Sequence, residues 1–221
     1  MQFPFNSSWP LVCIFFGAML FLILLMRWQG TFFYTKDVVV RRFSILDLEI
    51  PASPIELVNI IKGLYQLPVQ KKDASINALK TQLYIDFIFM PFAYGFVALL
   101  CVQVSRKMSL AAGSNIFLVF AFLQMVSWIL DIIENIYLLN KIKPTVEISS
   151  PGIHKAYLIM EAIKWGLALV STICAVAALF YFWLSGHFST GVLKYLIIFI
   201  AEIIIFFVLS KLIFKNSPAV N

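Results

Sequence analysis

The sequence predicts an all-α protein, a polytopic transmembrane helical bundle of five spans with a short insert between spans one and two. Of its 221 residues, 62% are hydrophobic and only 13% are charged. A soluble domain averages about 45–50% apolar and about 25% charged residues. Five apolar stretches also approach the ~20 residues needed to cross about 30 Å of hydrocarbon. Lipid offers no hydrogen bonds to the backbone, so each stretch should be helical.

The five predicted spans belong to a single membrane domain that covers residues 1–221. We expect them at about residues 11–26, 83–104, 115–139, 156–184 and 192–214. The first is slightly short and ends at a basic and aromatic pair that is typical of the membrane interface. The fourth is long enough to be tilted. Between the last two, a segment rich in glycine and serine predicts a short hairpin.

The insert, residues 27–82, is too long to be only a connection. The alternation of apolar and polar residues from Leu46 to Ile50 predicts a short strand or extended stretch. A capping box from Ser53 to Glu56, with proline at the first helical position, predicts a helix over residues 54–66. A second helix, capped by Asp73, should run directly into the second span. These elements cannot bury a core of their own, so they should lie on the membrane or pack under the bundle.

Basic residues predict the orientation of the bundle, because cytoplasmic loops carry an excess of lysine and arginine. One side of the membrane would hold only Arg106, Lys107 and Lys194. The other side would hold Arg27, Lys36, Arg41, Arg42, Lys62, Lys71, Lys72, Lys80, Lys141, Lys143, Lys155, Lys211 and Lys215. We therefore expect the N-terminus outside, the insert and C-terminus in the cytoplasm, and the protein in the cell (inner or plasma) membrane.

Composition and motifs exclude several functions. The net charge is +6, but no basic stripe with exposed aromatics is present, so nucleic acid is not an expected partner. Cys13, Cys101 and Cys174 each lie in an apolar run, so we predict no redox pair and no zinc site. No catalytic motif is present, and we predict no metal and no cofactor. The expected partner is the lipid bilayer, and the oligomeric state is left open.

Polar residues inside the spans predict a shared centre. The third span is the most unusual, because its helical phase places several polar groups on one face. The fourth span repeats this pattern, and the second and fifth spans carry acidic residues. The primary candidates to bind a ligand or ion are Asp86, Asp131, Glu134, Asn135, Glu161 and Lys164, and the secondary candidates are Gln124, His154 and Glu202.

The free-energy cost of exposing charged groups to lipid predicts that these side chains lie together. Several charged side chains facing lipid would cost on the order of 10 kcal/mol, comparable to the net stability of a fold. They must therefore face one another or a wet cavity. Lys164 is the only basic residue expected at the same depth in the membrane as these acidic groups, so we expect it to pair with Glu134 or Asp131. We expect Glu202 to approach this centre if its helix face allows.

Three short sequence motifs also indicate that these residues form one site. They are Leu46-Asp47-Leu48-Glu49, Tyr84-Ile85-Asp86-Phe87-Ile88-Phe89 followed by Tyr94, and Asp131-x-x-Glu134-Asn135. Together they resemble a loose set of small, uncharacterised polytopic bacterial integral membrane proteins. The resemblance covers roughly residues 45–140 and implies that Asp86, Asp131, Glu134 and Asn135 belong to one site. It implies no activity.

Three functions agree with this pattern. The leading hypothesis is binding or conduction of a proton, a cation or a small polar ligand at the acidic intramembrane centre. A structural or assembly subunit of a membrane complex is the first alternative, because buried polar groups also fix helix packing. A membrane enzyme acting on a lipid is the second. A cavity that reaches Asp131 and Glu134 would favour a functional centre over a packed one.

Overall fold

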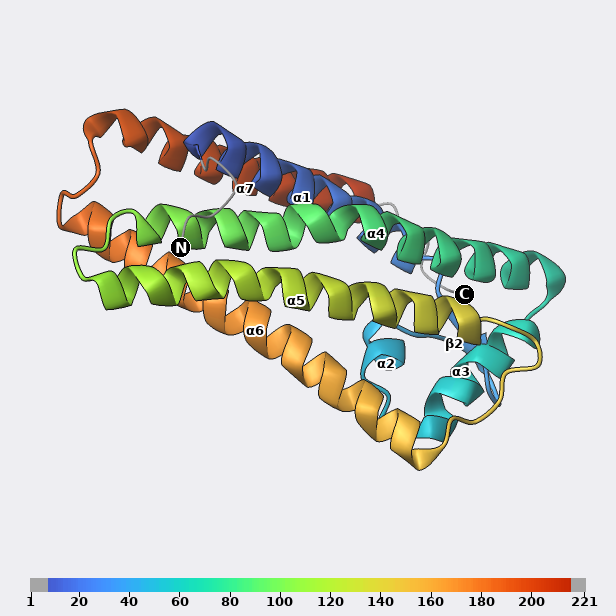
Figure 1. Cartoon of the computed structure of the whole chain (residues 1–221). Helices are drawn as coiled ribbons and strands as arrows, with labels where there is room; N and C mark the ends of the chain where they lie inside the picture. The colour runs from blue at the N-terminus through green and yellow to red at the C-terminus, as the bar shows by residue number, and fades with distance from the viewer. Residues whose placement is uncertain (1–7, 216–221) are drawn as a thin grey trace.

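The computed structural model describes residues 8–215 and consists of five long helices with a small insert at one end (Figure 1). The bounds of the long helices are α1 Trp9–Gly30, α4 Val69–Ser105, α5 Ala111–Lys141, α6 Pro151–Leu184 and α7 Leu193–Lys215. A single 3-10 turn, η1 Thr190–Val192, leads into α7. Five helices are long and apolar enough to cross a membrane. Within residues 8–215, the prediction of five long apolar helices is confirmed.

Helix α4 lies at the middle of the bundle. It packs along α1 on one side and along α5 on the other, while α7 packs along α1 (Figure 1). Gly95 permits the close approach of α1, because a Cβ atom there would lie 2.5 Å from the Phe15 ring. Helix α6 contacts both α4 and α5 and then diverges from α5 toward the insert end.

The predicted helix in the second half of the insert is the first part of α4. As expected, it continues into the second span without a break. The predicted cap at Asp73 is wrong, because the helix already begins after Pro68. A proline has no N–H group to pair, so it fits the start of a helix, where four N–H groups have no partner inside the helix.

The first half of the insert contains two strands at positions that the sequence did not predict. Two short strands, β1 Tyr34–Lys36 and β2 Val40–Arg42, form an antiparallel hairpin. The strand or extended stretch predicted at Leu46–Ile50 is wrong, because this segment forms the helical turn α2 Leu46–Glu49. Ser44 accounts for the difference: its Oγ accepts from the Leu46 N–H at 3.0 Å, and its own N–H donates to Asp47 Oδ2 at 2.8 Å. These local bonds hold the chain in a turn that leads into the helix, and they outweigh the alternation.

Helix α3, Pro54–Tyr65, confirms the capping box. Ser53 Oγ accepts from the Glu56 N–H at 3.3 Å, and Glu56 Oε2 accepts from the Ala52 N–H at 2.7 Å. Of the two positions predicted for this helix, the structure has the one under the bundle. Leu57, Ile61 and Leu64 are buried in one cluster with side chains of α4 and α5.

Two apolar clusters occupy the two ends of the bundle. The cluster at the insert end joins Phe33, Leu48 and Leu64 to Leu79 of α4 and Leu138 of α5. The cluster at the far end joins α1, α4, α5 and α6, and Cys101 and Ala175 are fully buried in it. The buried polar residues of α5 and α6 lie along the helices between these clusters.

Candidate functional site

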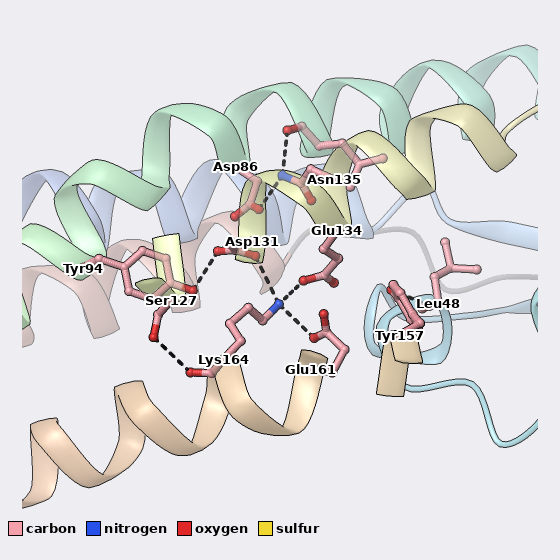
Figure 2. Close-up of polar contacts among 11 residues, drawn as sticks. Leu48, Asp86, Tyr94, Ser127, Asp131, Glu134, Asn135, Tyr157, Glu161 and Lys164 are labelled. Atoms are coloured by element: carbon pink, nitrogen blue, oxygen red, sulfur yellow. Dashed lines mark hydrogen bonds and ion pairs between the residues drawn. The ribbon is translucent and has the colours of Figure 1, made fainter. Parts of the chain in front are cut away.

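Lys164 of α6 is the centre of the buried polar layer (Figure 2). Its Nζ lies 3.1 Å from Asp131 Oδ1 and 2.8 Å from Glu161 Oε2, and it also donates to Glu134 Oε2. All four side chains are buried. Asp131 and Glu134 accept hydrogen bonds from the ammonium group, and Glu161 is paired with it by charge.

Helical phase explains why these four groups meet. Asp131 and Glu134 are three residues apart on α5, and Glu161 and Lys164 are three residues apart on α6, so each pair shares one face of its helix. The sequence predicted a single ion pair with Glu134 or Asp131. The structure instead places three carboxylates on Lys164, because the pair on α5 and the pair on α6 face each other.

Hydrogen bonds extend the centre to α4. The Tyr94 hydroxyl donates to Asp131 Oδ2 at 2.8 Å. The Asn135 amide donates to Asp86 Oδ2 at 2.7 Å and to the Leu83 carbonyl at 3.3 Å (Figure 2). The six primary candidates are thus divided between two adjoining groups, one around Lys164 and one at Asp86 and Asn135.

Glu49 of α2 adds a carboxylate that sequence analysis did not assign to the site. One oxygen from each of Glu49, Glu134 and Glu161 lies within 4.8 Å of the other two. The Tyr157 hydroxyl holds α2 in place by donating to the Leu48 carbonyl at 3.3 Å, and Leu48 is fully buried. The signal was present, since Glu49 ends one of the motifs that carry the resemblance, but nothing in the sequence places the insert against α6.

The pKa of Glu49 reflects this environment. Burial raises the pKa of its carboxyl from 4.5 to about 7, and the charges of Glu161, Asp86 and Asp131 act in the same direction, whereas Lys164 opposes them. Desolvation disfavours the charged form of a carboxyl group. Glu49 therefore changes its charge near neutral pH.

Anionic groups outnumber cationic ones at this centre. Lys164 faces Asp131, Glu134 and Glu161, and Glu49 lies beside two of these three. Among the described residues, no hydrogen-bond donor reaches Glu134 Oε1 or either carboxylate oxygen of Glu161, whose Oε2 is paired with Lys164 by charge. Buried carboxylate oxygens without partners are costly, so the centre has capacity to bind protons, a cation or a ligand.

A cavity of about 680 Å³ reaches the polar layer. Asp86, Asp131, Asn135, Lys164 and Glu49 contribute its polar end. Its other walls are mainly apolar side chains of α1, α4 and α6, including Met19, Ile23, Phe89, Phe96, Trp165 and Ala168. Small-molecule sites typically measure about 300–1,000 Å³ and combine apolar walls with a few polar groups. The cavity has this size and character.

The three secondary candidates lie outside the centre. Gln124 is buried on α5, seven residues before Asp131, and its amide donates to the Phe120 carbonyl at 3.2 Å. His154 is half-buried, seven residues before Glu161, which is about 10 Å along a helix axis. Glu202 lies against α1, where a Cβ atom on Gly17 would be 2.7 Å from its Oε1. Helix α7 packs along α1, so the expected approach of Glu202 to the centre is wrong.

Comparison with known proteins does not assign the chain to a family. No family model, curated protein or solved structure matches the chain. The resemblance to bacterial membrane proteins therefore stays a prediction, and the chemistry of the site rests on the residues themselves.

Proposed function

We propose that this multi-pass membrane protein binds a lipid-soluble ligand whose head group is cationic or donates hydrogen bonds. The cavity of about 680 Å³ carries this proposal, because it joins apolar walls to the acidic centre. The ligand's apolar part would lie along α1, α4 and α6. Its head group would lie at Asp86, Asp131 and Glu49. A purely structural polar layer would be packed and would need no such space.

The free polar atoms of the cavity favour a donating head group. Three carboxylates already surround the Lys164 ammonium, so the net charge around it is negative and disfavours an anionic ligand. Arg27 also lines the cavity, but it donates to Ser210 at 3.0 Å and lies over the Phe214 ring, both on α7. Gln82 Oε1 is a buried acceptor that no donor among the described residues reaches. An amine fits this arrangement better than a phosphate or carboxylate.

Direct binding of a simple amphiphile tests the proposal. Tritiated dodecylamine should bind saturably to the purified protein in lipid nanodiscs, and dodecyl sulfonate of matched chain length should not. Asp86→Asn removes an anionic partner of the head group, and Ala168→Phe fills the apolar part of the cavity. Each should weaken amine binding by about ten-fold or more, which corresponds to about 1.4 kcal/mol.

The control variant is Ala177→Phe, which adds the same side chain to an exposed position on the same helix. It should bind dodecylamine as the wild type does. Equal affinity for amine and sulfonate would contradict a cation-selective site. If the wild type and Ala168→Phe bound dodecylamine equally well, the amine would not bind in this cavity.

We also propose a position for the protein in the cell. The basic residues of the loops gather at the insert end, and the positive-inside rule assigns that end to the cytoplasm. The N-terminus would then lie outside the cell membrane, and the acidic centre would lie in the cytoplasmic half of the bilayer. A head group would reach the cavity from the side of the insert.

A further inference from the structure

Three carboxylates converge on the side of Lys164 that leads to α2. They come from three separate elements: Glu49 from α2, Glu134 from α5 and Glu161 from α6. One oxygen of each lies within 4.8 Å of the other two. We propose that these three side chains bind one divalent cation of the hard, oxygen-preferring class of Mg²⁺, Mn²⁺ and Ca²⁺. This site shares Glu49 with the polar end of the ligand cavity.

Unpartnered oxygens provide an observation beyond the acidic cluster. The Lys164 ammonium lies against Oε2 of Glu134, Oε2 of Glu161 and Oδ1 of Asp131. The Oε1 atoms of both glutamates are buried, and no described donor reaches them, although the two side chains are only 1% and 2% exposed. Figure 2 shows these oxygens on the side of Lys164 toward Leu48, where Glu134 and Glu161 face each other.

The spacing of the oxygens suits a metal ion. Ca²⁺–oxygen distances are about 2.3–2.6 Å, so oxygens on opposite sides of the ion lie about 5 Å apart. The limit of 4.8 Å among the three carboxylates falls within that span. Mg²⁺ and Mn²⁺ are smaller and would draw the side chains slightly inward. A donor set made only of oxygens favours these hard cations over zinc or copper, which prefer nitrogen and sulfur ligands.

The charges favour a divalent cation over a shared proton. A proton between Glu134 and Glu161 would satisfy one pair of oxygens and leave Glu49 beside them. A divalent cation can contact all three carboxylates and offsets two of the negative charges that Lys164 leaves unbalanced. Asp131 remains outside the proposed site, because its two oxygens accept from Lys164 and Tyr94.

Binding of a cation would also fix one wall of the ligand cavity. Glu49 and Leu46 of α2 both line the cavity. An ion held by Glu49 would link this short helical turn directly to α5 and α6, in addition to the bond between Tyr157 and the Leu48 carbonyl. The metal would thereby order the insert over the polar end of the cavity.

Paramagnetic Mn²⁺ is a direct probe of this site. The full-length protein is purified in detergent, stripped with EDTA and titrated with Mn²⁺ while electron paramagnetic resonance records the free ion. We expect one tightly bound Mn²⁺ per chain, which Mg²⁺ or Ca²⁺ displaces. Glu49→Gln should weaken binding by about ten-fold or more, since ligand charge sets the affinity of oxygen sites. This variant leaves the three contacts of Lys164 in place, so it should fold.

The matched control is Glu147→Gln, which removes an exposed carboxylate at the same end of the bundle and should bind Mn²⁺ as the wild type does. Carboxylates that hold only protons would take up no Mn²⁺, and that result would overturn the proposal. Equal affinity in Glu49→Gln and the wild type would also overturn it. Ala168→Phe separates the two sites, because it should lose dodecylamine and retain Mn²⁺.

Discussion

At the scale of single residues, Lys164 makes the buried polar layer tolerable. Asp131, Glu134 and Glu161 are each buried, and each has an oxygen on the Lys164 ammonium. Such an arrangement adds little net stability, because removing the charges from water offsets most of their attraction. Removing one partner is different, since it leaves the remaining charges buried without compensation.

Lys164→Met is therefore expected to destabilise the fold strongly. Breaking a buried ion pair from one side costs about 3–5 kcal/mol, and here three carboxylates lose their common partner. Chemical unfolding in detergent micelles, followed by far-UV circular dichroism, measures the change. Lys155→Met removes an exposed lysine from the same helix and should leave stability within about 0.5 kcal/mol of the wild type. Equal stability of the two variants would show that Lys164 is not the counter-ion of the centre.

The sequence predicts most of this centre and misses Glu49 for a physical reason. Asp131, Glu134, Glu161 and Lys164 lie on two long apolar helices, where phase and the cost of burying charge bring them together. Glu49 lies in the insert, and its place depends on contacts between segments far apart in the chain, such as the bond from Tyr157 to the Leu48 carbonyl. No local pattern encodes such contacts.

At the scale of elements, the same distinction separates the spans from the insert. A long apolar stretch in lipid must be helical, so length and hydropathy predicted the five long helices. The insert is held by packing: β1 lies against α3, where the Thr35 hydroxyl donates to the Ile60 carbonyl at 2.9 Å. Gly63 makes this contact possible, because a Cβ atom there would lie 2.5 Å from the Lys36 carbonyl oxygen and would also collide with the Thr35 hydroxyl.

Gly63→Ala should consequently loosen the insert. Overpacking of a tight contact costs about 1–3 kcal/mol, and here one of the opposing atoms belongs to the backbone. A lower midpoint of thermal unfolding and faster proteolysis of the insert would record the loss. Gly166→Ala is the matched control, because nothing lies within 4 Å of its added Cβ. It should raise helix stability by about 0.5–1 kcal/mol. If both variants gain stability, the close packing of β1 on α3 is wrong.

At the scale of the whole molecule, the polar layer is bounded by apolar structure at both ends. One apolar cluster combines the insert with α4 and α5, and the other combines the far ends of four helices. The hydrogen bond from Arg27 to Ser210 ties α1 to α7 at the insert end. The acidic centre includes Glu49 of the insert and therefore lies near the insert end. The side of the membrane that holds the insert would then decide from which compartment ions reach the centre.

Orientation can be measured with single cysteines at the two ends. Lys143 lies in the exposed loop between α5 and α6, and Ser189 lies in the exposed loop before α7 at the opposite end (Figure 1). The experiment uses a protein in which Cys13, Cys101 and Cys174 are replaced by alanine. The positive charge of the insert end is expected to keep that end in the cytoplasm, so the opposite end should lie outside the cell. A membrane-impermeant maleimide should therefore label Ser189→Cys on intact cells. Lys143→Cys should react only after permeabilisation, which should label both variants and thereby control for accessibility. The reverse pattern would place the insert outside, and Glu49, Glu134 and Glu161 would then take cations from the external medium.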